Sequence, residues 1–368
     1  MPAPVRATLE HALRATWTGR SPLACALWPL SRLYGALAAL HRTLYRRGWL
    51  RAERLPVPVI VVGNVIAGGA GKTPTTLALV AHLAAQGWRP GIVSRGHGRA
   101  TADVREVLAD ADPIAVGDEP LLLRQRAGAP VWVGARRADA GRALLAAHPT
   151  VDVLVCDDGL QHHALARDVE IVVFDARGAG NGWLLPAGPL REPWPRRFKD
   201  AREPWPRPVE AVLVTEAPAP HPSPLPEGAR EPGNPPVFTA TRRLAEHALG
   251  ADGTRVPLAT LRGTPLTAVA GIARPEAFFA MLQAAGLTLV DTVALPDHYY
   301  FDSLPRPIYK RETLICTEKD AAKLRRLHPR ALAVQLVLDV PAAFWAWLDE
   351  RLHAQGYHPR QRPPTPTE

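Results

Sequence analysis

GNVIAGGAGKTP, residues 63–74, is the stretch that decides the fold. It follows a β-branched run at 56–63 and leads into an apolar-periodic stretch that predicts a helix over 73–86. A glycine-rich turn between a strand and a helix is the context that a phosphate loop requires. The sequence therefore predicts a nucleoside triphosphate site here. A glycine-rich turn that holds no ligand is the alternative.

The residue types in this loop suit a triphosphate. Its glycines let backbone N–H groups curl around phosphate oxygens, Lys72 can reach the β- and γ-phosphates, and the Thr73 hydroxyl can ligate Mg²⁺. The usual GxxxxGKT pattern is met imperfectly, because Ile66 stands where the pattern has glycine. The predicted ATP-binding residues are Ile66, Ala67, Gly68, Gly69, Ala70, Gly71, Lys72 and Thr73.

A phosphate loop also needs a metal-holding carboxylate at the end of a neighbouring strand. The run Val151–Cys156 predicts a buried strand, and Asp157 and Asp158 follow it directly. Acidic residues at an ordinary strand-to-loop turn are the alternative, but the combination with Lys72 favours a metal site. The predicted Mg²⁺ ligands are Thr73, Asp157 and Asp158.

Short β-branched runs alternate with helical stretches along most of the chain, which predicts an α/β fold. For residues 56–236 we expect a P-loop NTPase-like α/β/α sandwich that ends in a Pro-rich linker at 188–236, where REPWPR occurs twice. For residues 237–356 we expect a second, smaller α/β/α domain. The polar, Pro-rich residues 357–368 are predicted to form a tail.

Positive charge is concentrated at the N-terminus. The 368 residues carry a formal net charge of +9, and residues 1–55 hold nine Arg against two Glu. The remainder is nearly neutral, which argues against a nucleic-acid partner. Three widely separated cysteines exclude a disulfide framework.

Residues 1–55 also predict an amphipathic helix that associates with a membrane. Apolar residues, with Tyr34 among them, recur at helical spacing from Leu23 to Leu44, and several arginines and Trp49 follow. This pattern is typical of a helix lying in the plane of an anionic membrane. No unbroken apolar run approaches the roughly 18 to 20 residues that span a bilayer. A helix packed on the protein's own core is the alternative.

Two acidic motifs stand outside these regions. GDEP, residues 117–120, places Asp118 at a predicted helix N-terminus, where capping explains a carboxylate as well as catalysis does. PDHYY, residues 296–300, places His298 beside an aspartate, although a lone histidine is more often structural than functional.

Taken together, the motifs resemble the tetraacyldisaccharide 4′-kinase family. They occur in the order GNVIAGGAGKTP, SRGHGR, GDEP, DDGLQHHALARD, GNGWLLPAGPLREP, GIARPEAFF, PDHYYF and TEKDAAKL, between residues 63 and 324. The resemblance implies a lipid kinase that uses ATP and Mg²⁺. It would phosphorylate the 4′-hydroxyl of a lipid A disaccharide precursor at the cytoplasmic face of the bacterial inner membrane, as a step of lipopolysaccharide biosynthesis that gives lipid IVA.

The same resemblance implies roles for single residues. Asp118 matches the catalytic base and His298 the histidine that pairs with it, so that with Lys72 they form the predicted catalytic set. Asp157 and Asp158 match the family's Walker B pair. The residues that match the lining of the nucleotide or sugar-phosphate site are Arg137, Gln161, Arg191 and Glu192. The implied partners are the lipid precursor, ATP and the anionic membrane surface, with no obligate protein partner.

Some positions depart from the family pattern, and two other functions compete with a lipid kinase. His97 stands where the family usually has Tyr, and Ile66 and Ala70 replace residues that are commonly polar. A partitioning ATPase is one competitor, but such proteins carry an extra Lys where this chain has Ala67. A kinase for a soluble sugar or nucleoside is the other, and it would leave the apolar, Arg-rich N-terminal region unexplained.

Overall fold

The computed structural model describes residues 16–99, 101–194, 211–215, 235–297, 299, 301 and 313–360. The chain divides into two compact units. The first comprises residues 1–241 and 340–368, and the second comprises residues 242–339. The second unit is therefore an insertion in the chain of the first.

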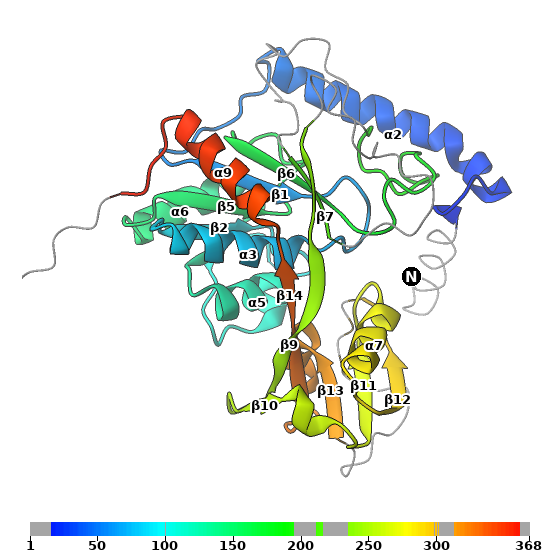
Figure 1. Cartoon of the computed structure of the whole chain (residues 1–368). Helices are drawn as coiled ribbons and strands as arrows, with labels where there is room; N and C mark the ends of the chain where they lie inside the picture. Colours follow the sequence, from blue (N-terminus) through cyan, green and yellow to red (C-terminus); the bar gives the residue numbers. More distant parts are fainter. Residues whose placement is uncertain are drawn as a thin grey trace, which may run out of the picture. The chain divides into compact units, whose positions relative to one another are not determined.

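The first unit is built on an eight-stranded sheet (Figure 1). Its strands are β1 (Val59–Gly63), β2 (Pro90–Ser94), β3 (Arg105–Glu106), β4 (Val131–Val133), β5 (Val153–Asp157), β6 (Val169–Phe174), β7 (Ala211–Val214) and β8 (Val237–Thr239). They lie in the order β3-β4-β2-β5-β1-β6-β7-β8. Every neighbouring pair is parallel except β3 with β4. The strand before the phosphate loop thus lies directly beside the strand that ends in Asp157.

Helices cover both faces of this sheet, as predicted. They are α3 (Lys72–Ala85), α4 (Pro113–Val116), α5 (Asp118–Ala127), α6 (Arg137–Ala147) and α9 (Ala342–Ala354). The connections β1–α3–β2 and β2–α5–β4 both lead toward the β3 edge of the sheet. The connection β4–α6–β5 leads in the opposite direction. Right-handed crossovers therefore place α3 and α5 on one face and α6 on the other.

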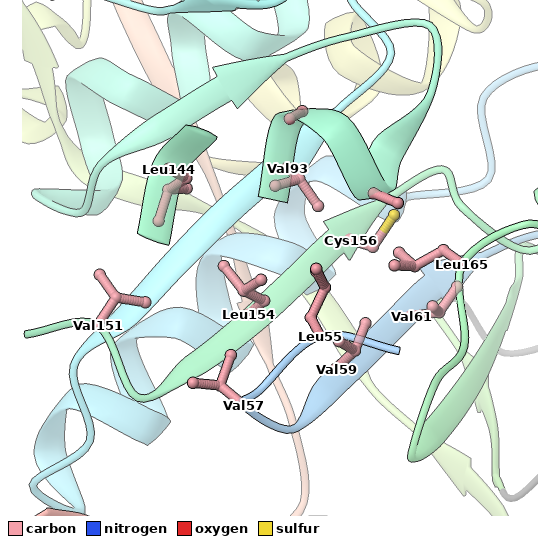
Figure 2. Packing of buried hydrophobic residues seen from close by; sticks show 12 residues of the cluster. Leu55, Val57, Val59, Val61, Val93, Leu144, Val151, Leu154, Cys156 and Leu165 are labelled. Atoms are coloured by element: carbon pink, nitrogen blue, oxygen red, sulfur yellow. The ribbon is translucent and has the colours of Figure 1, made fainter. Parts of the chain in front are cut away.

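Figure 2 shows the core on the α6 side of the sheet. Alternate residues of β1, Val59 and Val61, pack there with Leu154 and Cys156 of β5 and with Leu144 of α6. Because neighbouring residues of a strand face opposite sides, Ile60 and Val62 face the α3 side. All five residues of β1 are buried, so the strand that leads into the phosphate loop is packed on both faces of the sheet.

The last helix, α9, belongs to the first unit, whereas the sequence predicted that it is part of the smaller domain at 237–356. Its Asp349 carboxylate lies 2.9 Å from Nε2 of His82 in α3, and Trp345 stacks on the same imidazole. Phe344 is buried and meets the Phe238 ring of β8 edge-on. A local strand-helix alternation cannot reveal which of two sheets the helix covers.

The second unit is a smaller α/β/α arrangement with a six-stranded sheet. Its strands are β9 (Thr241–Leu249), β10 (Arg255–Pro257), β11 (Leu266–Ala270), β12 (Leu289–Ala294), β13 (Thr313–Thr317) and β14 (Leu332–Asp339), in the order β10-β9-β14-β13-β11-β12. The helix α7 (Pro275–Ala284) packs with one set of alternate strand residues and α8 (Glu318–Leu324) with the other. A short 3-10 helix, η1 (Leu258–Leu261), follows β10.

The N-terminal helix α2 (Pro22–Arg46) begins where the Ser21 hydroxyl accepts a hydrogen bond from the Ala24 N–H, 3.2 Å away. Its 25 residues extend about 37 Å. By length and composition alone, α2 is long and apolar enough to cross a membrane, although one such helix is weak evidence for a membrane span. The prediction that no segment approaches the spanning length is therefore corrected. That expectation relied on an unbroken apolar run, and Arg32 and His41 interrupt the run without ending the helix.

Candidate active site

The phosphate loop joins β1 to α3. Gly68 and Gly71 have φ angles of 94° and 90°, a region that glycine enters without steric cost. The Ile66 and Ala70 side chains are buried in an apolar cluster that includes Phe174. At these two atypical positions, therefore, only the backbone is left to meet a ligand.

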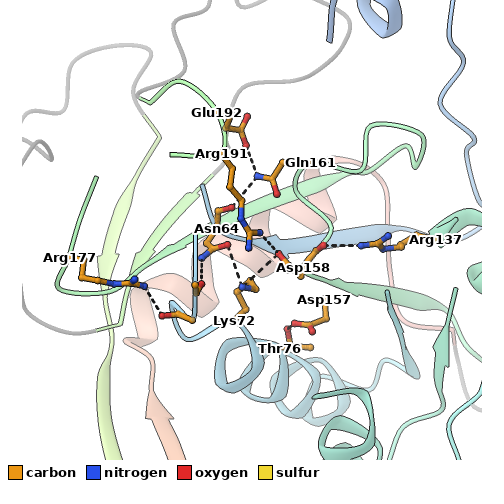
Figure 3. A network of polar contacts seen from close by, with 12 residues as sticks. Asn64, Lys72, Thr76, Arg137, Asp157, Asp158, Gln161, Arg177, Arg191 and Glu192 are labelled. Carbon is orange, nitrogen blue, oxygen red and sulfur yellow. Dashed lines mark hydrogen bonds and ion pairs between the residues drawn. The ribbon is translucent and has the colours of Figure 1, made fainter. Parts of the chain in front are cut away.

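Lys72 is the first residue of α3, and its ammonium group lies among polar groups of three segments (Figure 3). Its Nζ is 3.4 Å from Oδ1 of Asn64 and 3.8 Å from Oδ1 of Asp158. The Asn64 amide also donates to the carbonyl oxygen of Gly68, at 3.0 Å. Asn64 therefore fixes both the loop and the lysine.

Asp157 is the last residue of β5 and Asp158 follows it, at the strand end that the sequence predicted, but their environments differ. Asp157 is buried, and its Oδ1 accepts a hydrogen bond from the Thr76 hydroxyl at 2.9 Å. Burial, and then the charges of Glu119 and Asp158, raise the pKa of Asp157 to about 7. Burial also acts against the charged form of Asp158, but Lys72, Arg191 and Arg137 outweigh it and lower the pKa of Asp158.

This carboxylate pair fits a magnesium ion. Oδ2 of Asp157 is buried and has no hydrogen-bond partner, so a cation bound there would supply the missing partner for this oxygen. Among the described residues no group of three or more His, Cys, Asp or Glu could form a cage made of protein ligands alone. Mg²⁺ in kinases needs no such cage, because one or two carboxylates, phosphate oxygens and water complete its coordination. Thr73 lies in the first turn of α3, next to Lys72.

Gln161, Arg191 and Glu192 are brought together beside the phosphate loop (Figure 3). Nε2 of Gln161 donates to the Asn64 carbonyl oxygen at 3.1 Å and to Oε1 of Glu192 at 2.9 Å. Nη1 of Arg191 lies 3.3 Å from Oδ1 of Asp158. Residues 188–194, at the start of the predicted linker, are thus part of the candidate site.

Arg137 approaches Asp158 from α6. Its guanidinium donates to the Asp158 carbonyl oxygen at 3.2 Å and to the Ala135 carbonyl oxygen at 3.0 Å. The side chain is buried, and burial lowers the pKa of Arg137. Three cations, Lys72, Arg137 and Arg191, therefore surround the Asp158 segment, as a site for a polyanion requires.

Asp118 is the first residue of α5, which packs on α3. The preceding Gly117 has a φ angle of 95° and is so close to the His97 carbonyl that a Cβ there would lie 3.2 Å from its oxygen. The neighbouring Glu119 is close enough to Asp157 to raise its pKa. GDEP therefore lies at the same edge of the sheet as the carboxylate pair. His298 lies outside the described residues, so its role stays a prediction.

The inner side of α2 contacts the loop that carries Arg191. The Ser31 hydroxyl donates to the Leu184 carbonyl at 2.7 Å and accepts from the Ala187 N–H at 3.0 Å. The Tyr34 hydroxyl donates to the Arg191 carbonyl at 2.8 Å. Tyr34 was expected on the membrane-facing side and lies on the inner side instead. Helical spacing alone could not separate the two sides, because α2 is apolar around most of its circumference.

Asn64, Thr76 and Arg177 are among the polar residues of this region that were not predicted from the sequence. Asn64 lies within the quoted loop motif, and Thr76 lies one turn after Lys72, so spacing could have suggested both. Arg177 follows β6 and reaches the loop over 110 residues of chain, a contact that no local pattern signals.

A glycine-rich phosphate loop on a parallel sheet, with paired carboxylates on the adjacent strand and converging arginines, defines a P-loop phosphotransferase. A family model described as Tetraacyldisaccharide-1-P 4′-kinase matches residues 23–353. The chain belongs to this family.

Named relatives and a solved structure agree with this assignment. The tetraacyldisaccharide 4′-kinase of Acidovorax sp. (strain JS42) is 59% identical over 353 residues, covering 96% of this chain and 98% of the relative. The enzyme of the same name from Delftia acidovorans is 53% identical over 355 residues, with the same coverage. The crystal structure of LpxK from Aquifex aeolicus in complex with ATP superimposes with a TM-score of 0.71 at 27% identity, covering 89% of this chain and 99% of that one.

Proposed function

We propose that this protein transfers the γ-phosphate of ATP to the 4′-hydroxyl of a tetraacyldisaccharide 1-phosphate and thereby forms the 4′-phosphorylated lipid A precursor. The observation that carries the proposal is the convergence of Lys72 and Arg191 on Asp158, at 3.8 and 3.3 Å, directly beside the phosphate loop. Phosphoryl transfer consists largely of positioning the reactants and neutralising charge, and these groups supply both.

Each residue group then has a role. Backbone N–H groups of the phosphate loop and the Lys72 ammonium bind the β- and γ-phosphates. Thr73, Asp157 and Asp158 would hold Mg²⁺, and the ion would neutralise charge on the phosphate oxygens. Arg137 and Arg191 attract the polyanionic reactants, and Gln161 with Glu192 fixes the Arg191 loop. Asp118 accepts the proton of the attacking hydroxyl, with His298 as its predicted partner.

A direct assay tests this function. We expect purified protein to transfer labelled phosphate from ATP to a tetraacylated disaccharide 1-phosphate presented in detergent, and to turn over the deacylated disaccharide much more slowly, because α2 and its surroundings favour a lipid substrate. Thin-layer separation of the labelled products measures both rates. Equal turnover of the deacylated compound would contradict a lipid kinase, and transfer to neither compound would contradict the kinase activity itself.

We further propose that α2 holds the protein on the cytoplasmic face of the inner membrane without crossing it. Its inner side is hydrogen-bonded to the first unit through Ser31 and Tyr34. Its outer side carries a stripe of exposed leucines, 55 to 58% exposed: Leu30, Leu33, Leu37 and Leu40. A helix that uses one side for its own protein has the other available for the interfacial region of a bilayer.

Replacing Leu33 and Leu37 together by Ser should weaken binding to vesicles of anionic phospholipid by about 100-fold. Full burial of a leucine side chain is worth about 1.5 to 3 kcal/mol, and each of these two has only 58% of its surface left to bury. Co-sedimentation measures the effect. Leu108→Ser is the matched control, because this leucine is 54% exposed and lies outside α2. Unchanged sedimentation of the double variant would favour a purely structural α2.

A further inference from the structure

Arg177 is a polar side chain that contacts the phosphate loop from outside the loop motif. It follows β6, and its guanidinium spans two loop carbonyls. Nη2 donates to the Gly69 carbonyl oxygen at 2.8 Å, and Nη1 to the Ala67 carbonyl oxygen at 3.3 Å. The guanidinium therefore binds alternate peptide groups of the loop from one side.

A buried carboxylate holds this guanidinium in place. Nε of Arg177 lies 3.0 and 2.9 Å from the two carboxylate oxygens of Asp175, whose side chain is fully buried at the end of β6. The Arg177 backbone N–H donates to the same carboxylate, at 3.1 Å. Nη2 lies 2.9 Å from Oδ2 of Asp175 as well. The planar fork of arginine suits this arrangement, because Nε and one side of Nη2 can bind Asp175 while Nη1 and the remaining N–H of Nη2 are directed at the loop.

The contacts determine which way the loop amides point. In a trans peptide the C=O and N–H groups point in opposite directions. When Arg177 binds the carbonyls of Ala67 and Gly69, the N–H groups of Gly68 and Ala70 are directed to the opposite side. Asn64 and Thr215 bind the intervening and following carbonyls, those of Gly68 and Ala70, at 3.0 and 3.3 Å. Side chains thus fix four successive peptide groups, those whose carbonyls belong to Ala67, Gly68, Gly69 and Ala70.

We propose that Arg177 and Asp175 form a clamp that presets the phosphate loop for a nucleoside triphosphate, with Arg177 as a positioning residue for ATP. The proposal rests on the proposed function of this loop. Preorganised N–H groups bind an anion more tightly because the protein need not order them when the anion arrives. Loss of the clamp should therefore weaken ATP binding while chemistry at saturating ATP changes little.

The first test is Arg177→Met, with Arg142→Met as the matched control. Arg142 also forms ion pairs with carboxylates, but on the surface of α6. We expect Kd and KM for ATP to rise roughly 10-fold in Arg177→Met, the scale of one or two charge-assisted hydrogen bonds. The KM for the lipid and kcat should stay near the values of the control. A lower kcat at unchanged KM for ATP, or an unchanged Kd, would overturn the clamp.

Asp175→Asn separates a clamp from a direct charge effect. If Arg177 acted by attracting the triphosphate, removal of the neighbouring negative charge would tighten ATP binding. If Arg177 acts by holding the loop, the loosened guanidinium should weaken ATP binding, and tighter binding would overturn the proposal. Arg177→Lys provides a milder variant, and we expect it to bind ATP with an affinity between those of wild type and Arg177→Met.

Wild-type measurements separate failure of the clamp from failure of the proposed function. ATP binding by wild type without lipid phosphorylation would refute the proposed function and leave the clamp testable by Kd alone. Full lipid kinase activity with unaltered ATP affinity in all clamp variants would refute only the clamp.

Discussion

Replacing Lys72 by Met should lower kcat/KM for phosphate transfer by roughly 10²- to 10³-fold, the effect of removing one preorganised electrostatic group from a transition state. The Lys72 side chain is only 10% exposed and lies beside Asn64 and Asp158. In this environment its charge is poorly replaced by water. Steady-state kinetics with the lipid substrate and ATP titration of the same variant measure the loss.

Lys72→Arg is the informative companion variant. It keeps the positive charge but replaces a compact ammonium group by a planar fork that does not suit the same position. We expect it to retain some ATP binding and to lose most of its turnover. Near wild-type turnover of Lys72→Met would remove the lysine from the phosphate site, whereas full activity of Lys72→Arg alone would show that charge matters and geometry does not.

Much of the fold could be predicted because its central strands have a clear sequence pattern. β1, β5 and β6 are β-branched runs buried along their whole length, and such runs give a strong local signal. β9 and β12 gave no such signal, because most of their residues are only partly buried and several are charged. The placement of α9 depends on contacts with His82 and Phe238, which are distant in the sequence.

The candidate site was predictable to the extent that its residues lie in short motifs. Lys72, Asp157 and Asp158 are brought together because β1 and β5 are neighbours in a parallel sheet, a consequence that the strand pattern already suggests. The inward orientation of Tyr34 and the reach of Arg177 to the phosphate loop depend on tertiary packing, which no local pattern contains. The side chains of Ile66 and Ala70 are buried, which explains why a loop that departs from the GxxxxGKT pattern can still present its backbone N–H groups to phosphate.

Replacing Asp118 by Asn should lower kcat by about 10²- to 10⁴-fold, the contribution of a general base, while the Kd for ATP stays close to that of wild type. The carboxylate lies at the start of α5, at the sheet edge that also carries Asp157, where a base for the sugar hydroxyl is required. Single-turnover assays at saturating ATP isolate this step from substrate binding and product release.

The competing explanation is that Asp118 only stabilises the start of α5. Asp118 is the first residue of α5 and not its N-cap, which is Gly117, so Asp118→Asn loses only the attraction of a negative charge to the helix N-terminus. That attraction is worth about 0.3 to 1 kcal/mol, so the variant should unfold close to the wild-type temperature. Asp112→Asn is the matched control, since Asp112 caps α4 through the Ile114 N–H and Asn can make the same bond. If Asp118→Asn is as stable as this control and yet nearly inactive, the carboxylate acts on the substrate proton. Wild-type kcat in Asp118→Asn would leave the base to another residue.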